Sequence, residues 1–228
     1  MASPDAQLPI PDPRHLLPLL YPILDAGLVL REVPPGSRAR RTLLHLLAHE
    51  LADAGVTLLQ YRNKQDSDDV FLEDTLALRG AAPAVRLILN DRPALVAGAG
   101  AHGVHVGQSD MPAAQVRALL GPDAHIGLST NTPEEVRAGD RAPVDAMAIG
   151  PVFATASKSD TNPIVGLDGV RRARALTRKP LIAIGGITPA NAAAVLAAGA
   201  DSLAVISAIF GANRSPGEAA RAFLAISK

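Results

Sequence analysis

The chain has 228 residues, no cysteine, and equal numbers of basic and acidic side chains, 22 Lys and Arg against 22 Asp and Glu. The missing cysteine excludes disulfides, thiolate catalysis and metal sites built on cysteine ligands. A net charge of zero and an aromatic content of 3% argue against binding to nucleic acid or to an anionic membrane, because both need a strong positive field and base stacking needs aromatic rings.

The first 18 residues are rich in proline and are predicted to form an irregular tail, followed by a single folded domain over residues 19–228. The start of the chain lacks the basic and then apolar segments of a secretory signal. No apolar run approaches the roughly 18 residues of a membrane helix. The sequence therefore predicts a cytoplasmic protein without a membrane partner.

Short apolar runs alternate along the chain with segments of helical periodicity. The predicted strands are Tyr21–Leu24, Val56–Tyr61, Arg86–Leu89, Gly103–Val106, His125–Leu128, Ala146–Ile149, Leu181–Ile184 and Ser202–Val205. The predicted helices are Arg38–Ala54, Asp68–Gly80, Pro93–Ala99, Ala113–Leu120, Pro133–Gly139, Gly166–Leu176, Pro189–Ala198 and Pro216–Ile226. Most of the strands are apolar throughout, which is typical of a parallel sheet covered on both faces.

Local signals mark several helix ends. Ser37 and Thr132 each precede a predicted helix and offer a hydroxyl to its free N–H groups. Gly55, Gly100 and Gly199 stand where a left-handed residue commonly ends a helix. Eight β–α units over this length, without the G-x-G-x-x-G fingerprint after the first strand, favour a single closed (β/α)₈ TIM barrel of the α/β class over a Rossmann sheet.

In such a barrel the functional residues follow the strands, at the C-terminal face. Polar residues or paired glycines occupy these places in the sequence: Gln60, Arg62, Lys64, Asn90, Asp91, His105, Asp110, Ser129, Thr155, Ser157, Lys158, Gly185, Gly186 and Ser207. Their convergence at one end of the barrel predicts a polar site with both positive and negative groups.

Asp91 and Asp110 follow adjacent strands, and two carboxylates at one cavity suit Mg²⁺ together with substrate phosphate. The alternative is that each caps the helix after it. Arg62, Lys64 and Lys158 either grip phosphate or are solvated surface charges.

Gly185-Gly186 and the end of the eighth strand at Ile206-Ser207 match the place where many barrels bind phosphate through backbone N–H groups. The alternative is a plain turn after a strand.

Other charged groups are predicted to be structural. His45 and His49 are four residues apart, but the residue after the first is leucine, so the zinc motif H-E-x-x-H is not satisfied. Arg38, Arg40 and Arg41 are predicted to form a solvated helix face.

Six segments resemble, in family order, the motifs of thiamine-phosphate synthases, which include Q-L-R-x-K, N-D, H-x-G-Q-x-D and G-P-V-F-x-T-x-(T/S)-K. The segments are Gln60–Lys64, Asn90–Arg92, His105–Asp110, Gly150–Lys158, Ala183–Ile187 and Ala204–Ser207. The resemblance implies a (β/α)₈ barrel and a transferase. The expected reaction joins 4-amino-2-methyl-5-(diphosphooxymethyl)pyrimidine to a thiazole phosphate, giving thiamine monophosphate and diphosphate.

The same resemblance implies roles for the matched residues. Asp91 and Asp110 would hold Mg²⁺. The pyrimidine diphosphate would be bound by Arg62, Lys64, Asn90, Ser129 and Lys158, with Gln60 near the ring; Arg62, Lys64 and Lys158 would be catalytic. The thiazole phosphate would be bound by Thr155, Ser157, Gly186, Ile206 and Ser207, the last two chiefly through the backbone. His105 matches a family position without an assigned role.

Two departures from the family pattern flank Arg62. Tyr61 and Asn63 replace the commoner Leu and Glu, and strand alternation predicts that Tyr61 faces the helices. The segment Gly27–Ser37 is longer than the simplest barrel loop and is predicted to be a mobile cover.

Three rival functions stay open. A thiazole tautomerase-like paralogue would share the thiazole phosphate pocket without needing the whole diphosphate and Mg²⁺ set. A non-catalytic thiamine-phosphate binding protein could be distinguished from the synthase only by an activity assay. A sugar-phosphate isomerase would need a base aimed at a carbonyl carbon, and no separate candidate stands out. A net charge of zero neither favours nor forbids a homo-oligomer.

Overall fold

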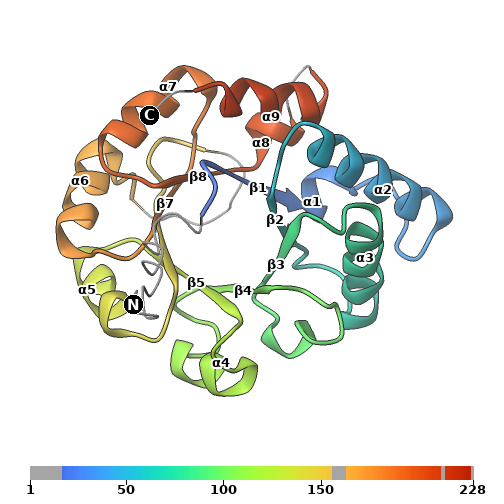
Figure 1. Ribbon diagram of the computed structural model, residues 1–228, viewed down its shortest axis with the longest axis horizontal. Coiled ribbons are helices and arrows are strands. Elements are labelled where there is room, and N and C mark those ends of the chain that lie inside the picture. Colours follow the sequence, from blue (N-terminus) through green and yellow to red (C-terminus); the bar gives the residue numbers. More distant parts are fainter. Residues whose placement is uncertain (1–16, 156–162, 212–213, 227–228) are drawn as a thin grey trace, which may run out of the picture.

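The computed structural model describes residues 17–155, 163–211 and 214–226, and within these residues eight parallel strands close into a barrel (Figure 1). The strands are β1 (Leu20–Asp25), β2 (Leu58–Arg62), β3 (Arg86–Asn90), β4 (Gly103–Val106), β5 (His125–Thr130), β6 (Ala146–Ile149), β7 (Leu181–Ile184) and β8 (Ser202–Val205). Each strand pairs with the next in the sequence, and β8 pairs with β1 to close the ring. The predicted TIM barrel is confirmed.

Helices cover the outside of the barrel (Figure 1). They are α1 (Ala26–Val29), α2 (Arg38–Asp53), α3 (Asp68–Ala81), the 3₁₀ turn η2 (Pro93–Leu95), α4 (Ala113–Leu120), α5 (Pro133–Arg141), α6 (Gly166–Leu176), α7 (Pro189–Ala197), α8 (Ser207–Phe210) and α9 (Pro216–Leu224). In the described part of the chain, no helix is long and apolar enough to cross a membrane.

Most predicted boundaries agree with the structure to within one or two residues, and the expected caps form. The hydroxyl of Ser37 accepts a hydrogen bond from the Arg40 N–H at 3.1 Å, and that of Thr132 accepts one from Glu135 at 3.2 Å. The helix predicted over Pro93–Ala99 is wrong beyond Leu95, because the segment is short and continues as hydrogen-bonded turns. The short helices α1 and α8 were not predicted, since four residues carry no helical period.

Two apolar layers hold the barrel together. Side chains inside the ring, such as Tyr21, Leu58 and Ile182, form an inner core, while the alternate strand residues pack outward against the helices. Tyr61 belongs to the outer layer and lies against Phe71 of α3, with ring centroids 4.9 Å apart, so its predicted orientation is confirmed. The chain enters the inner core at Leu17, whereas residues 1–16 of the predicted tail lie outside the described residues.

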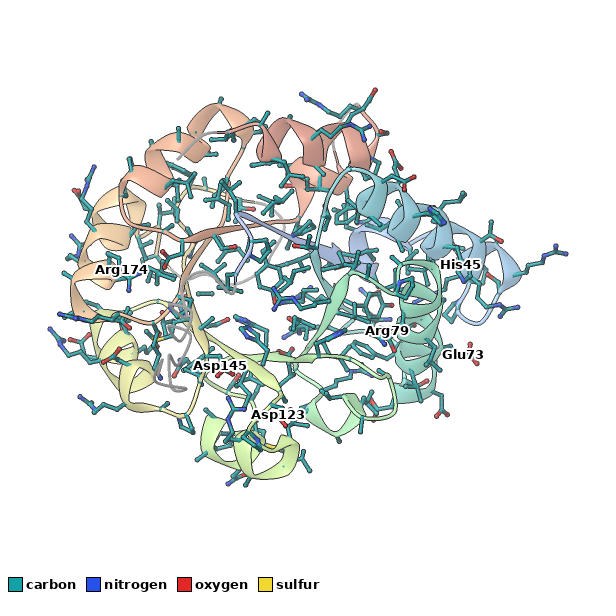
Figure 2. All side chains as sticks on the ribbon, viewed as in Figure 1. His45, Glu73, Arg79, Asp123, Asp145 and Arg174 are labelled. Atoms are coloured by element: carbon teal, nitrogen blue, oxygen red, sulfur yellow. The ribbon has the colours of Figure 1, made fainter. Side chains whose placement is uncertain are left out.

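The prediction that Arg40 is solvated is wrong, because its side chain is only 3% exposed. Positions 40, 44, 47 and 51 of α2 recur at helical spacing and share the buried face of the helix. The guanidinium pairs with Asp74, which lies within α3, and with Asp66, which lies just before α3. His45, by contrast, lies on α2 at the periphery of the molecule (Figure 2).

One arrangement recurs at the N-terminal end of the barrel. Asp145, just before β6, accepts hydrogen bonds from Arg117 of α4 at 2.6 Å and from the Ile126 N–H of β5 at 2.7 Å. Asp201, just before β8, does the same with Arg174 of α6 at 2.8 Å and the Leu181 N–H of β7 at 2.9 Å. Both sites lie on the outer part of the barrel, where Figure 2 labels Asp145 and Arg174. These two sets of hydrogen bonds connect helices to strands and stabilise the N-terminal end of the barrel.

A partly buried histidine at this end predicts how stability depends on pH. Burial lowers the pKa of His125, and Arg86 and Arg117 lower it further against the opposing charge of Asp145. The ring therefore takes up a proton at lower pH in the folded protein than in the unfolded chain, where the ordinary pKa is about 6.5. We therefore expect Tm to fall as the pH drops from about 7.5 to about 5.5, because the unfolded state binds more protons.

Calorimetry across this range checks the expectation, with His125→Gln as the comparison. The variant should show a shallower slope of Tm against pH. Part of the slope should stay, because burial also lowers the pKa of His102. A slope equally steep in the variant and the wild type would contradict the assignment to His125.

Candidate active site

A cavity of about 760 Å³ opens at the C-terminal ends of the strands. The predicted site residues that line it are Gln60, Arg62, Lys64, Asn90, Asp91, His105, Asp110, Ser129, Thr155, Gly186, Ile206 and Ser207. Ser157 and Lys158 lie outside the described residues. The structure thus brings every described member of the predicted set to one cavity.

The acidic pair lies at the mouth of this cavity. The side chains of Asp91 and Asp110 are within hydrogen-bonding contact; burial raises the pKa of Asp110, and the neighbouring Asp91 raises it further. The Gly107 N–H donates to Asp110 Oδ2 at 2.7 Å, and Lys64 Nζ lies 3.0 Å from Asp91 Oδ2. Two carboxylates in contact at an open cavity repel each other unless a proton or a cation lies between them.

Neither carboxylate caps a helix. Arg92 and Pro112 occupy the N-cap positions of η2 and α4, and neither helix has a side-chain cap. The alternative that each carboxylate caps the following helix is therefore wrong. Among the described residues no cluster of three or more His, Asp or Glu side chains is placed to hold a metal. The pair nevertheless fits Mg²⁺, which often takes one or two protein carboxylates and fills its other positions with water and phosphate.

Arg62 is held by a residue that the sequence did not indicate. Its Nη1 forms an ion pair with Oδ2 of Asp25, which lies opposite Arg62 in the β1–β2 register. Asp25 also caps α1, because its Oδ1 accepts from the Leu28 N–H at 3.3 Å. The pairing depends on strand register, so no local signal could have found it.

His105 lies beside Ser129 on the neighbouring strand. His105 Nε2 is 2.9 Å from Ser129 Oγ, and Gln108 Nε2 donates to the Ser129 carbonyl at 2.6 Å. Gly127 makes room for the imidazole, since a Cβ at this position would lie 2.3 Å from His105 Nδ1. The geometry gives His105 a role in orienting the Ser129 hydroxyl.

Inside the barrel, Gln60 Nε2 donates to the Tyr21 hydroxyl at 3.0 Å. Burial raises the pKa of Tyr21, so its hydroxyl stays protonated. This bond fixes the orientation of the Gln60 amide within the cavity. Tyr21 is a second site residue that sequence reasoning missed, because an aromatic at a strand start looks like any core residue.

The paired glycines lie against the segment that follows β6. Gly185 and Gly186 adopt φ values of 103° and 62°, in the left-handed region that favours glycine. A Cβ on Gly186 would lie 2.6 Å from the Ala154 carbonyl oxygen, and one on Gly185 would lie 2.6 Å from Pro151 Cβ. The backbone thus forms a tight wall beside Thr155, and Ser207 at the start of α8, which follows the neighbouring strand β8, lines the same cavity.

The chain is similar to known proteins over most of its length. The family model described as thiamine monophosphate synthase matches residues 33–209. A thiamine-phosphate synthase of Koribacter versatilis is 51% identical over 191 residues, covering 83% of this chain and 88% of the relative. One from Albidiferax ferrireducens is 47% identical over 175 residues, covering 76% and 80%.

A solved structure has the same fold. The thiamine phosphate pyrophosphorylase from Pyrococcus furiosus superposes with a TM-score of 0.76 at 28% identity, covering 90% of this chain and 93% of that one. The family match, these relatives and the arrangement of the cavity agree. The chain therefore belongs to the thiamine monophosphate synthase family.

Proposed function

We propose that this protein, a transferase of thiamine biosynthesis, joins 4-amino-2-methyl-5-(diphosphooxymethyl)pyrimidine to thiazole phosphate and releases diphosphate and thiamine monophosphate. The observation that carries this proposal is the arrangement of one cavity. Its mouth holds a carboxylate pair with Lys64 and Arg62, and a glycine wall lies beside Thr155. These two halves suit two different phosphate-bearing substrates.

The diphosphate half is assigned to the carboxylate side of the cavity. A Mg²⁺ ion bound by Asp91 and Asp110 would supply a Lewis acid that neutralises negative charge on diphosphate oxygens. Arg62 and Lys64 are fixed cations that stabilise the charge growing on the leaving diphosphate as the C–O bond breaks. Lys158 is proposed to act with Arg62 and Lys64, because it matches the lysine of the family motif at Gly150–Lys158. Asn90 and Ser129 are proposed to donate hydrogen bonds to the same substrate.

Gln60 is proposed to recognise the pyrimidine ring. Because its amide N–H is engaged with Tyr21, its Oε1 is the atom available to accept from an amino group of the substrate. The aminopyrimidine then delocalises the positive charge left on its exocyclic carbon, so no protein nucleophile is needed.

The thiazole phosphate is assigned to the glycine wall. Backbone N–H groups at Gly186, Ile206 and Ser207, with the Thr155 hydroxyl and Ser157, are proposed to bind its phosphate. This fixes the thiazole nitrogen, which carries the attacking electron pair, beside the pyrimidine carbon. Alignment of two bound substrates can remove roughly 7–11 kcal/mol of a barrier.

The decisive assay incubates the purified protein with both substrates and Mg²⁺. We expect thiamine monophosphate and diphosphate in equal amounts, and neither product when one substrate is omitted or EDTA is added. Isomerisation of the thiazole carboxylate phosphate without the pyrimidine would instead identify a tautomerase. Binding of thiamine phosphate without turnover would identify a binding protein. The cytoplasmic location and a homo-oligomer stay predictions.

A further inference from the structure

The reverse side of β2 carries a buried polar network that the chemistry of the cavity does not use. Gln60 and Arg62 line the cavity, whereas Tyr61 and Asn63, between and after them, are buried away from it with exposed fractions of 0% and 3%. At these two positions the chain carries Tyr and Asn in place of the commoner Leu and Glu of the family pattern. Their side chains join a set of charged groups between α2, α3 and the loop after β2.

A buried ion pair forms the centre of the network. Arg40 of α2 donates from Nε to both oxygens of Asp74 of α3, at 2.9 and 3.0 Å, and from Nη2 to Asp74 Oδ2 at 2.6 Å. The same Nη2 donates to Asp66 Oδ2 at 2.7 Å. A buried arginine between two carboxylates needs this many hydrogen bonds to offset its desolvation. The pair therefore fixes α2, α3 and Asp66 relative to one another.

Tyr61 and Asn63 connect β2 to this centre. The Tyr61 hydroxyl donates to Asp74 and accepts from Asn63 Nδ2 at 3.2 Å. Asn63 Nδ2 also donates to Asp66 Oδ2 at 2.9 Å, and its Oδ1 accepts from the N–H groups of Gln65 and Asp66, both at 3.1 Å. The Asn63 side chain thus uses both donor hydrogens and accepts two hydrogen bonds. It holds the loop on either side of Lys64.

Asp66 stays ionised within the network. Although burial acts in the opposite direction, hydrogen bonds from Asn63 and Arg40 lower the pKa of Asp66. The network is therefore an arrangement of complementary charges rather than a chance contact of polar groups.

Arg92 links the same loop to the end of β3. Its Nη2 donates to the carbonyls of Asn63 at 3.1 Å and Asp66 at 2.7 Å, and its guanidinium lies 4.6 Å from the centre of the Phe71 ring. Arg92 directly follows Asp91, whose carboxylate lies 3.0 Å from Lys64 Nζ. Arg92 thereby connects the loop that carries Lys64 to the turn that carries Asp91, through contacts with residues that do not line the cavity.

We propose that Tyr61 and Asn63, with Arg40, Asp66 and Asp74, are positioning residues that hold Arg62 and Lys64 in the geometry that receives the diphosphate of the substrate. The proposal rests on the proposed function for the identity of that substrate. The Lys64 side chain is 55% exposed and its Nζ is paired with Asp91, so the position of its ammonium depends on the backbone from which it projects and on the turn that carries Asp91. A site on a loop is precise only when packing and hydrogen bonds hold that loop.

The test uses Tyr61→Phe and Asn63→Ala in the full chain. Tyr61→Phe keeps the ring against Phe71 and removes only the hydroxyl. Each variant should raise KM for the pyrimidine diphosphate about tenfold, because the loop no longer holds Lys64 toward the diphosphate, and leave KM for thiazole phosphate unchanged. Calorimetric affinity for inorganic diphosphate with Mg²⁺ should fall by about the same factor.

A matched control removes a buried hydroxyl hydrogen bond far from the loop. Thr177 Oγ1 donates to Asp140 Oδ1 at 2.5 Å at the N-terminal end of the barrel. Thr177→Val should lower Tm without changing either KM or the diphosphate affinity. The proposal is overturned if Tyr61→Phe and Asn63→Ala behave like this control, lowering Tm alone.

The design also distinguishes a folding defect of Tyr61→Phe from a failure of the proposed function. If Tyr61→Phe does not fold, Asn63→Ala decides by the same measurements, because Asn63 does not contact Asp74 and its loss leaves the ion pair of Arg40 with Asp74 in place. If the wild type makes no thiamine monophosphate, the proposed function fails. The affinity of the variants for inorganic diphosphate then still tests the positioning role by itself.

Discussion

Asp91→Asn is expected to lower kcat/KM by a factor on the order of 10³, because loss of the carboxylate removes several kcal/mol of charge stabilisation at the leaving diphosphate. The Asn side chain keeps the size of Asp91 but brings no negative charge to the cavity mouth. Steady-state kinetics at saturating Mg²⁺ measure the effect. Tm should stay the same or rise, because the contact with Asp110 loses its repulsion.

Asparagine is the right replacement because of the backbone at this position. Asp91 has a φ of 64°, and asparagine tolerates this left-handed conformation better than alanine does. Asp91→Gly is a useful second variant, since glycine accepts the same φ and also lacks the carboxylate. Both variants should be equally inactive. Turnover within threefold of the wild type in either would refute the assignment of Asp91.

Gly186→Ala is expected to lower kcat/KM for thiazole phosphate at least about a hundredfold, mainly through KM, because the phosphate wall must shift. The added Cβ would meet the Ala154 carbonyl oxygen at 2.6 Å and Phe153 Cβ at 2.7 Å, in a backbone at φ 62°. The neighbouring atoms belong to the segment leading to Thr155. KM for the pyrimidine diphosphate should change little, because that substrate is assigned to the opposite side of the cavity.

Gly121→Ala is a control that adds backbone strain without displacing any neighbouring atoms. Gly121 has a φ of 77°, but a Cβ there meets nothing within 4 Å. This control should lose about 1–3 kcal/mol of stability to backbone strain, because its ψ of −177° is almost confined to glycine, and should keep both KM values. Should Gly186→Ala show the same mild behaviour as Gly121→Ala, the glycine wall would have no part in binding thiazole phosphate.

Much of this molecule is predictable from the sequence because it is local. The continuous apolar runs indicate strands buried on both faces, and Ser37 and Thr132 mark helix starts through bonds that span three residues. Polar residues directly after the strands gather at one end because parallel strands end on the same side. The barrel and every described member of the predicted cavity follow from these features.

What only the tertiary structure decided involves partners far apart along the chain. The pairing of Arg62 with Asp25 depends on strand register, and the contact of Arg40 with Asp74 depends on the packing of α2 against α3. In both cases the sequence shows a charged residue but not the opposite charge that burial brings to it. The local sequence pattern therefore determined the barrel and the groups that face its cavity. Long-range packing decided which charged side chains pair with each other, because the partners come from distant parts of the chain.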